Sequence, residues 1–203
     1  MAGQVATSLK AALRREILAA RDALTVAARD ERSIRITQKV LALEAYRNAT
    51  CVLAYMSFGS EFNTSALLAD VRANGKQLCL PRVNRDTHNL EIHRVENLET
   101  ELRSGVMGIR EPLAGCPRTE LNRIDFVLMP GVAFTPNCDR LGYGGGYYDR
   151  LITQFARRPP LIAAVFGLQM RDEIPLTTFD QRVDAVVTES VIYNANLMIS
   201  NDF

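Results

Sequence analysis

The chain has 203 residues, of which 47% are hydrophobic and 23% charged, and its formal net charge is +1. Length and composition fit one soluble globular domain, residues 1–203. The balance of charge excludes a global field for nucleic acid or membrane, and no apolar run approaches the roughly 20 residues of a membrane span. No signal peptide is recognisable. We expect a cytoplasmic protein whose partners are small molecules, a monomer with a dimer as the alternative.

Two helices are expected at the N-terminus. Apolar residues at helical spacing predict the first helix, from Ser8; they are Leu9, Leu13, Ile17 and Leu24. A basic stripe of Lys10, Arg14 and Arg21 runs beside them, and on the sequence alone such a stripe is typical of a solvated face. Asp30 is expected to cap the second helix, residues 31–46. Together the two helices predict an N-terminal helical hairpin.

From residue 51 onward, apolar runs alternate with a helical pattern. Buried strands are expected at residues 51–57, 77–80, 126–129, 161–166 and 185–188, with a shorter edge strand at 90–94. Asn63 is expected to cap a helix that ends at Ala73. A short helical turn is expected at residues 97–103, followed by a surface loop at 105–122. This alternation predicts an α/β fold, an open three-layer sandwich with a largely parallel sheet flanked by helices on both faces.

Four segments each follow a predicted strand directly: Glu61, Arg82, Pro130 and the loop that begins at Arg140. In open α/β sheets, ligands bind beyond the carboxyl ends of the strands. We therefore expect these segments to converge at one end of the sheet and to form the functional site.

The loop of residues 140–150 reads Arg-Leu-Gly-Tyr-Gly-Gly-Gly-Tyr-Tyr-Asp-Arg and is the strongest functional signal in the chain. Glycine permits positive φ and lets an anion approach backbone N–H groups, and a helix from Tyr147 onward would add its N-terminus. The flanking arginines suit phosphate. Asp149 beside a phosphate requires an intervening cation, which indicates Mg²⁺. The spacing matches neither the Walker nor the dinucleotide motif, and a flexible surface turn is the alternative.

This loop closely resembles the signature of the 5-formyltetrahydrofolate cyclo-ligase family, whose members are also called methenyltetrahydrofolate synthetases. The supporting segments, in chain order, are residues 10–24, Tyr55-Met-Ser57 with Glu61 and Thr64, Leu80-Pro-Arg-Val83, Gly108-Ile-Arg-Glu-Pro112, Pro130-Gly-Val-Ala-Phe134 and residues 184–189. The resemblance implies ATP- and Mg²⁺-dependent conversion of 5-formyltetrahydrofolate to 5,10-methenyltetrahydrofolate, with release of ADP and phosphate. The formyl oxygen would be phosphorylated and then displaced by N10 of the same folate.

The resemblance also assigns the site residues. Lys10 and Arg14 would contact the nucleotide phosphates, and Asp149 and Asp184 would hold the metal. Arg140, Tyr148 and Asp149 would act in catalysis. The ATP-binding positions would be Lys10, Arg14, Arg140, Leu141, Gly142, Tyr143, Gly144, Gly145, Gly146, Tyr147 and Tyr148. The substrate-binding positions would be Glu61, Tyr143, Gly144, Gly145, Gly146 and Tyr147.

The chain departs from the family pattern just ahead of the loop, where Thr135 stands in place of the usual Asp and Cys138-Asp139 follows. Other functions stay open on the sequence, because a fold does not fix an activity. One is an ATP-dependent salvage paralogue with another substrate, and a second is a phosphate-ester isomerase or CoA-transferase-like enzyme. A third is a non-catalytic module, against which the intact basic, glycine and acidic positions argue.

Overall fold

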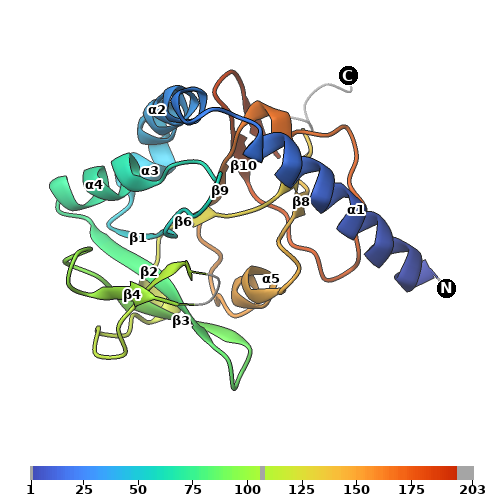
Figure 1. Cartoon of the computed structure of the whole chain (residues 1–203). Helices are drawn as coiled ribbons and strands as arrows, with labels where there is room; N and C mark the ends of the chain where they lie inside the picture. The colour runs from blue at the N-terminus through green and yellow to red at the C-terminus, as the bar shows by residue number, and fades with distance from the viewer. Residues whose placement is uncertain (1, 106–107, 196–203) are drawn as a thin grey trace, which may run out of the picture.

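The computed structural model describes residues 2–105 and 108–195 and is built around a seven-stranded sheet (Figure 1). The strands lie in the order β11-β10-β9-β6-β1-β2-β3. The parallel strands are β1 (Cys51–Leu53), β2 (Gln77–Asn84), β6 (Phe126–Met129), β9 (Leu161–Ala164) and β10 (Ala185–Val187). Antiparallel strands close both edges, β3 (Asn89–Arg94) on β2 and β11 (Ile192–Asn194) on β10. The expected largely parallel α/β sheet is confirmed.

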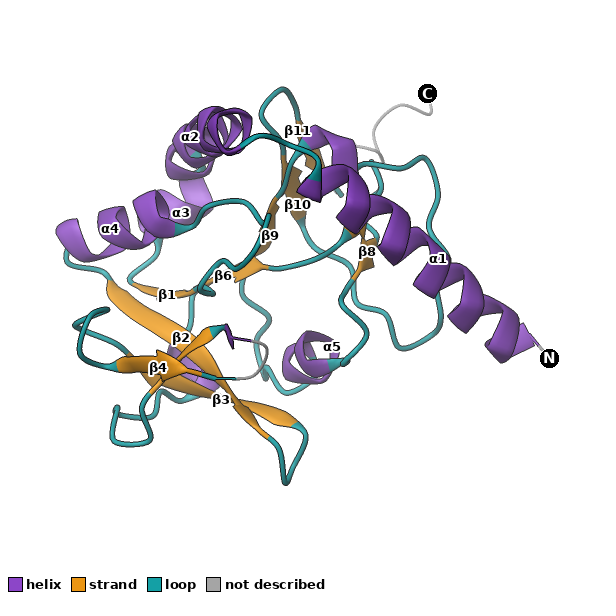
Figure 2. Cartoon of the chain, viewed as in Figure 1, coloured by secondary structure: helices purple, strands orange, loops and turns teal. Residues whose placement is uncertain are grey.

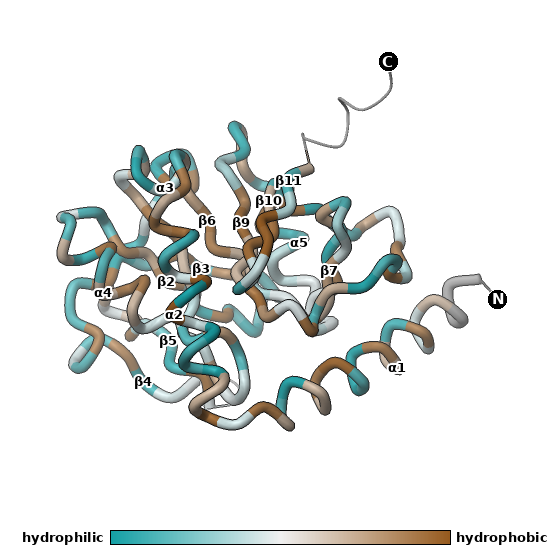
Figure 3. The backbone as a smooth tube through the Cα atoms, turned by 90° about the horizontal axis from the view of Figure 1, so that it is seen from above, coloured by the Kyte–Doolittle hydropathy of each residue, from teal (hydrophilic) through white to brown (hydrophobic). Residues whose placement is uncertain are grey.

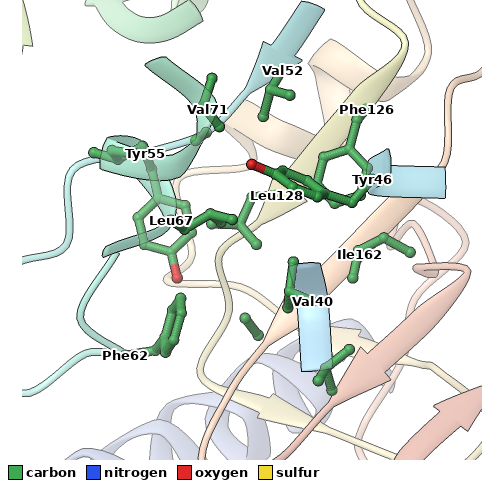
Figure 4. Packing of buried hydrophobic residues seen from close by; sticks show 14 of the residues in the cluster. Val40, Tyr46, Val52, Tyr55, Phe62, Leu67, Val71, Phe126, Leu128 and Ile162 are labelled. Atoms are coloured by element: carbon green, nitrogen blue, oxygen red, sulfur yellow. The ribbon is translucent and has the colours of Figure 1, made fainter. Parts of the chain in front are cut away.

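Helices cover both faces of the sheet (Figure 2). One face carries α2 (Val26–Ala42), α3 (Glu44–Asn48) and α4 (Ser65–Ala73), and the other carries α5 (Tyr147–Ile152) and the 3-10 turn η2 (Leu121–Arg123). Successive side chains of a strand point to opposite faces. On β6, therefore, Phe126 and Leu128 join the first cluster, which Figure 4 shows, while Val127 and Met129 join the second. The hydropathy colours of Figure 3 show the same concentration of apolar residues on the central strands.

The first helix, α1 (Ala2–Asp22), does not form a hairpin with α2, and this expectation is wrong. Its inward residue Ile17 is fully buried in a separate small cluster with Val132 and Leu141. The helix contacts the hairpin of β7 (Ala133–Phe134) and β8 (Arg140–Leu141) and the 3-10 turn η3 (Gly167–Gln169). The apolar face of α2 packs instead on β9 and β10, so the two helices run apart (Figure 3).

Several helices begin or end at other residues than expected, and two of them have a different N-cap residue. α1 begins well before Ser8. α2 begins at Val26, because Thr25 rather than Asp30 accepts the N–H of Ala28 at 3.2 Å. An extended residue, Leu43, separates α2 from α3, so the expected helix of residues 31–46 is divided. The N-cap of α4 is Thr64, and Asn63 accepts the next free N–H, that of Ser65, at 3.1 Å.

Strand boundaries also differ. β1 and β9 end earlier than expected, and β2 continues through Pro81 to Asn84. Beyond Cys79, β2 pairs only with β3, so the missing N–H of Pro81 interrupts no second ladder. The expected turn and surface loop contain a small sheet of β4 (Leu102–Ser104) and β5 (Arg110–Pro112), and residues 106 and 107 lie outside the described part.

Candidate active site

The glycine loop connects β8 to α5, and its glycines are required by geometry. Gly144 and Gly146 have φ of 104° and 67°, a region that residues with a Cβ rarely adopt. A Cβ on Gly142 would lie 2.9 Å from a terminal nitrogen of Arg140, so a larger residue there would displace that guanidinium. The loop is therefore a formed structure, and α5 begins at Tyr147 as expected.

Two cations of α1 lie at the site, Arg14 on the loop itself and Lys10 on Asp180. Lys10 is only 8% exposed and forms an ion pair with Asp180. The Nε of Arg14 donates to the carbonyl of Gly142 at 2.8 Å. The basic stripe of α1 is thus not a solvated face, because it lies against the loop that was expected to bind phosphate.

Arg140, at the start of the loop, and Asp149, in α5, form an ion pair. Arg140 is 3% exposed; it pairs with Asp149 Oδ1 and donates to the carbonyl of Pro130 at 3.3 Å. Its Nε lacks a hydrogen-bond partner among the described residues, and so does the buried hydroxyl of Tyr148. A buried polar atom without a partner costs free energy, so two orphan groups at one place indicate a ligand.

A buried carboxylate, Glu61, lies on the other side of the loop. Its Oε2 accepts the N–H of Phe58 at 3.1 Å, and its Oε1 accepts the hydroxyl of Tyr143. Burial raises the pKa of Glu61, and the bond from Tyr143, the Phe58 amide and the charge of Arg21 oppose that rise. Burial raises the pKa of Tyr148, and the nearby Glu61 charge raises it further. Glu61 and the loop tyrosines therefore face one another.

Among the described residues no hydrogen bond or ion pair joins Asp184 to Asp149, so their pairing as metal ligands stays a prediction. Asp184 lies at the amino end of the parallel strands, where it accepts the N–H of Leu161 at 2.7 Å and pairs with Arg158. Asp180 lies in the site. It holds Lys10, and the N–H of the next residue, Gln181, donates to Asp149 at 3.1 Å. Burial works against ionisation of Asp180, but the bonds from Lys10 and Thr177 outweigh it and lower its pKa.

Asp149 and Asp180 are the carboxylates of the site that could hold a metal ion. The hydrogen bonds described for Asp149 fall on Oδ1 and those for Asp180 on Oδ2, which leaves one oxygen of each carboxylate. Mg²⁺ typically takes one or two protein carboxylates, with phosphate and water oxygens filling its shell. Within residues 2–105 and 108–195, no group of three or more His, Cys, Asp or Glu side chains could hold a metal alone.

Other expected residues take different positions. The side chain of Leu141 is core, so only its backbone can belong to an ATP site. The ring of Tyr147 lies beneath Arg150, 5.1 Å from the guanidinium carbon to the ring centroid. Arg150 in turn donates to the carbonyls of Gly145 and His88. Arg82 lies opposite Glu91 in the register of the β2–β3 ladder, so it is inside a strand and does not follow one.

The departure at Thr135 is compensated locally. The hydroxyl of Thr135 lies 3.0 Å from Asp139 Oδ2 and accepts the N–H of Asp139 at 3.1 Å. A carboxylate is therefore present at this turn, contributed by Asp139, which also pairs with Arg182. Cys138 adopts a positive φ of 63°, a conformation that favours glycine.

Sequence reasoning missed two residues of the site. Arg21 was grouped with a solvated stripe, yet it is 3% exposed and donates to Tyr143. Asp180 was passed over for Asp184, although the bonds from the N–H and hydroxyl of Thr177 to the Asp180 carboxylate form a local turn that places it. The spacing of Thr177 and Asp180 was the available signal.

The fold and site define an α/β enzyme in which a glycine loop joins a set of phosphate-suited cations to a buried carboxylate. Residues 6–189 match the sequence model of the 5-formyltetrahydrofolate cyclo-ligase family, and the chain belongs to that family. It is 29% identical to the mouse 5-formyltetrahydrofolate cyclo-ligase over 198 residues, 93% of this chain and 98% of that one.

Two solved structures share the fold. The NMR structure of Aquifex aeolicus 5,10-methenyltetrahydrofolate synthetase has a TM-score of 0.81 and 29% identity, and covers 92% of this chain and 93% of its own. A Mycoplasma pneumoniae 5,10-methenyltetrahydrofolate synthetase has a TM-score of 0.73 and 26% identity, and covers 89% of this chain and 99% of its own. None of the helices in the described part of the chain is long and apolar enough to cross a membrane.

Proposed function

We propose that this protein converts 5-formyltetrahydrofolate to 5,10-methenyltetrahydrofolate with ATP and Mg²⁺, releasing ADP and phosphate. Membership of the cyclo-ligase family over residues 6–189 supports the reaction. The observation that carries the proposal for this chain is the position of the glycine loop between the cations proposed to bind phosphate and the carboxylate proposed to bind folate. Arg14 holds its Gly142 carbonyl on one side, and its Tyr143 hydroxyl holds Glu61 on the other.

The chemistry explains why one loop must serve both the phosphates and the folate. An N-formyl group is an amide, whose carbon is a poor electrophile and whose oxygen is a poor leaving group. Transfer of the γ-phosphoryl group to the formyl oxygen breaks its bond to ADP and turns the formyl carbon into an iminium-like electrophile. N10 then forms a bond to that carbon and loses its proton, while the carbon–oxygen bond breaks and the oxygen leaves with phosphate. Catalysis consists of positioning and charge neutralisation, because attack within one molecule requires no protein nucleophile.

Each residue of the site has a role in this scheme. The carboxylate of Glu61 would accept N–H bonds from the reduced pterin, whose ring edge presents several donors. Lys10, Arg14 and Arg140 would neutralise the phosphates, and the hydroxyl of Tyr148 is a donor still without a partner among the described residues. Bound Mg²⁺ would offset the charge on the phosphate oxygens, and Asp149 and Asp180 are the residues that would hold it.

The direct test is turnover of the purified protein with 5-formyltetrahydrofolate, ATP and Mg²⁺. The conjugated methenyl product absorbs at longer wavelength than the substrate, so its formation can be followed directly while released phosphate is measured in parallel. We expect one phosphate for each methenyl group, because the formyl oxygen leaves once in each ring closure. ATP binding without methenyl formation would contradict the reaction and favour the salvage paralogue, whereas product formation without ATP would contradict the phosphoryl-transfer scheme.

A further inference from the structure

Arg21, in the last turn of α1, is a buried cation whose partners are hydroxyl groups. It is 3% exposed, its Nε donates to Ser60 Oγ at 2.9 Å, and one terminal nitrogen donates to Tyr143 Oη at 2.9 Å. Among the described residues, no carboxylate forms a direct ion pair with it. A buried guanidinium normally needs such a partner, so its two hydroxyl contacts require an explanation.

The hydroxyl groups of Ser60 and Tyr143 each accept a hydrogen bond from Arg21 and donate one to a carboxylate. Arginine has donors only, so each hydroxyl must accept from Arg21 and turn its own proton elsewhere. The Ser60 hydroxyl donates to Asp22, and the Tyr143 hydroxyl donates to Glu61. The direction of the Tyr143 O–H bond is therefore fixed by Arg21, and it points at the carboxylate proposed to bind folate.

The link from Arg21 through Tyr143 affects the charge state of Glu61. Burial raises its pKa, and the groups that face it from the neighbouring elements are Tyr55 after β1, Tyr148 on α5, Tyr143 on the loop and Arg21 on α1. Arg21 is the one permanent cation in this set. A neutral Glu61 would present an O–H in place of one acceptor and would match the pterin donors poorly.

We propose that Arg21 is a positioning residue for the folate site, which holds Glu61 ionised and Tyr143 in place through the Tyr143 hydroxyl. This inference rests on the proposed function only in taking Glu61 as the folate carboxylate. The fixed hydroxyl also joins α1 to the loop after β1, so the helix that carries Lys10 and Arg14 is aligned with the folate side by the same contact.

Binding of 5-formyltetrahydrofolate without ATP, measured by calorimetry from pH 5.5 to 8.5, tests this role without turnover. The variants are Arg21→Met, Tyr143→Phe and the double variant. Arg29→Met is the matched control, because Arg29 tethers the same loop through the Gly59 carbonyl at 3.2 Å but has no described contact with Glu61. In Arg21→Met, folate affinity should fall by about tenfold at neutral pH, the loss expected for one charge-assisted hydrogen bond.

The pH profile distinguishes positioning from general stability. Without Arg21 the pKa of Glu61 rises, so the acid-side loss of folate affinity should begin at higher pH than in the wild type. Tyr143→Phe should shift the profile in the same direction, and the double variant should lose no more than the weaker-binding single variant, because both changes break one connection. Arg29→Met should keep the wild-type affinity and profile.

Several results would overturn the proposal: a wild-type folate profile in Arg21→Met, an equal loss in Arg29→Met, or fully additive losses in the double variant. If Arg21→Met does not fold, Arg21→Lys and Tyr143→Phe carry the test, since Lys keeps the charge but replaces the planar guanidinium that bonds both hydroxyl groups with a single ammonium. If the wild type binds no folate, the proposed function fails instead. In that case the ¹³C shift of the Glu61 carboxyl still reports its titration, which must move to higher pH without the Tyr143 hydroxyl.

Discussion

At the scale of single residues, Glu61 is the most selective probe of the folate side. Glu61→Gln keeps the shape of the side chain but removes the charge that would accept pterin N–H groups. We expect folate affinity to fall by roughly 1.5–3 kcal/mol, the contribution of a charged hydrogen bond, and ATP affinity to stay unchanged. Calorimetry with each ligand measures both. Glu31→Gln, on an exposed pair with Arg35, is the control, and an equal loss of ATP affinity in Glu61→Gln would contradict its assignment to folate.

The metal assignment gives a prediction that separates two nearby carboxylates. Asp149→Asn and Asp180→Asn should each raise the Mg²⁺ concentration needed for ATP binding by about tenfold or more. They should also lower the melting temperature, because Arg140 and Lys10 each lose the carboxylate of a buried ion pair. Asp184→Asn should lower the melting temperature without changing the Mg²⁺ requirement, because its carboxylate accepts the Leu161 N–H and pairs with Arg158 at the start of β9. Magnesium titrations of ATP binding and thermal melts are compared. A raised Mg²⁺ requirement in Asp184→Asn alone would favour Asp184 over Asp180 as a metal ligand.

Much of the site could be predicted from the sequence because its residues follow strands or lie on one helix stripe. Arg14 and Glu61 contact the glycine loop, and Lys10 lies beside it on Asp180. The position of Asp180 could not be predicted, since it lies in an irregular segment whose path depends on the contacts of Thr177 and Gln181. The burial of Arg21 could not be predicted either, because its partners Ser60 and Tyr143 lie far from it in the sequence.

At the scale of elements, Ile17 provides the buried apolar contact of α1. Ile17 is fully buried in the small cluster that joins α1 to Val132 and Leu141. Ile17→Ala should lower the free energy of unfolding by about 2–5 kcal/mol, the usual range for a large-to-small change in a core. It should also weaken ATP binding, because α1 presents Lys10 and Arg14. Leu9→Ala is the control, since Leu9 is 53% exposed and its truncation should cost less than about 0.5 kcal/mol.

For Ile17→Ala, urea unfolding gives the stability and calorimetry gives the ATP affinity. A stability loss with unchanged ATP affinity would mean that α1 keeps its alignment through Lys10 and Arg14 alone. Equal effects of Ile17→Ala and Leu9→Ala would contradict the packing assigned to the small cluster.

The β2–β3 hairpin gives a pH prediction. Hydrogen bonds from Asn84 and Arg118 to Glu91 lower the pKa of Glu91 to about 2. An acid with a depressed pKa stabilises the fold above its unfolded pKa, and this contribution is lost as the pH falls toward the folded value. Melting temperature should therefore fall from about pH 4.5 toward pH 2 more steeply in the wild type than in Glu91→Gln. Because Arg118 is largely exposed, we expect no more than about 1 kcal/mol, and parallel pH profiles would contradict it.

The order and type of the central elements followed from alternation of apolar and helical patterns, which the sheet and α4 satisfy. The errors have local causes. Pro81 reads as a strand stop, but it lies where β2 has a partner on one side only. Leu43 breaks a continuous helical pattern, because tertiary packing of Tyr46 on Phe126, with ring centroids 5.5 Å apart, directs α3 onto the sheet. The expected hairpin of α1 and α2 does not form because α1 packs on β7 and η3, whereas α2 packs on β9 and β10.

At the scale of the whole molecule, the site joins segments from both ends of the chain. α1 provides Lys10, Arg14 and Arg21, the loop after β1 provides Glu61, and the segment before β10 provides Asp180. A monomer carries the whole arrangement, so light scattering should give a mass near 22.6 kDa with full activity. Activity that appears only in a larger species would contradict a self-sufficient chain.

Because the site ties distant segments together, its ligand should stabilise the whole fold. At a concentration of 100 times its Kd, ATP with Mg²⁺ should add about 2.7 kcal/mol, since it binds the folded state alone. For a chain of this length that corresponds to a rise in melting temperature of roughly 5–10 °C. CoA and NAD should give no comparable rise, because neither has the terminal γ-phosphoryl group that the proposed site holds beside a metal. A rise with CoA alone would favour the transferase-like alternative. Hydrogen exchange locates the effect: ATP should protect the amides of residues 10–21, 142–148 and 177–181, while β4 and β5, which lie outside the site, should exchange as before. Uniform protection across the chain would mean that ATP stabilises the fold without closing these segments on one another.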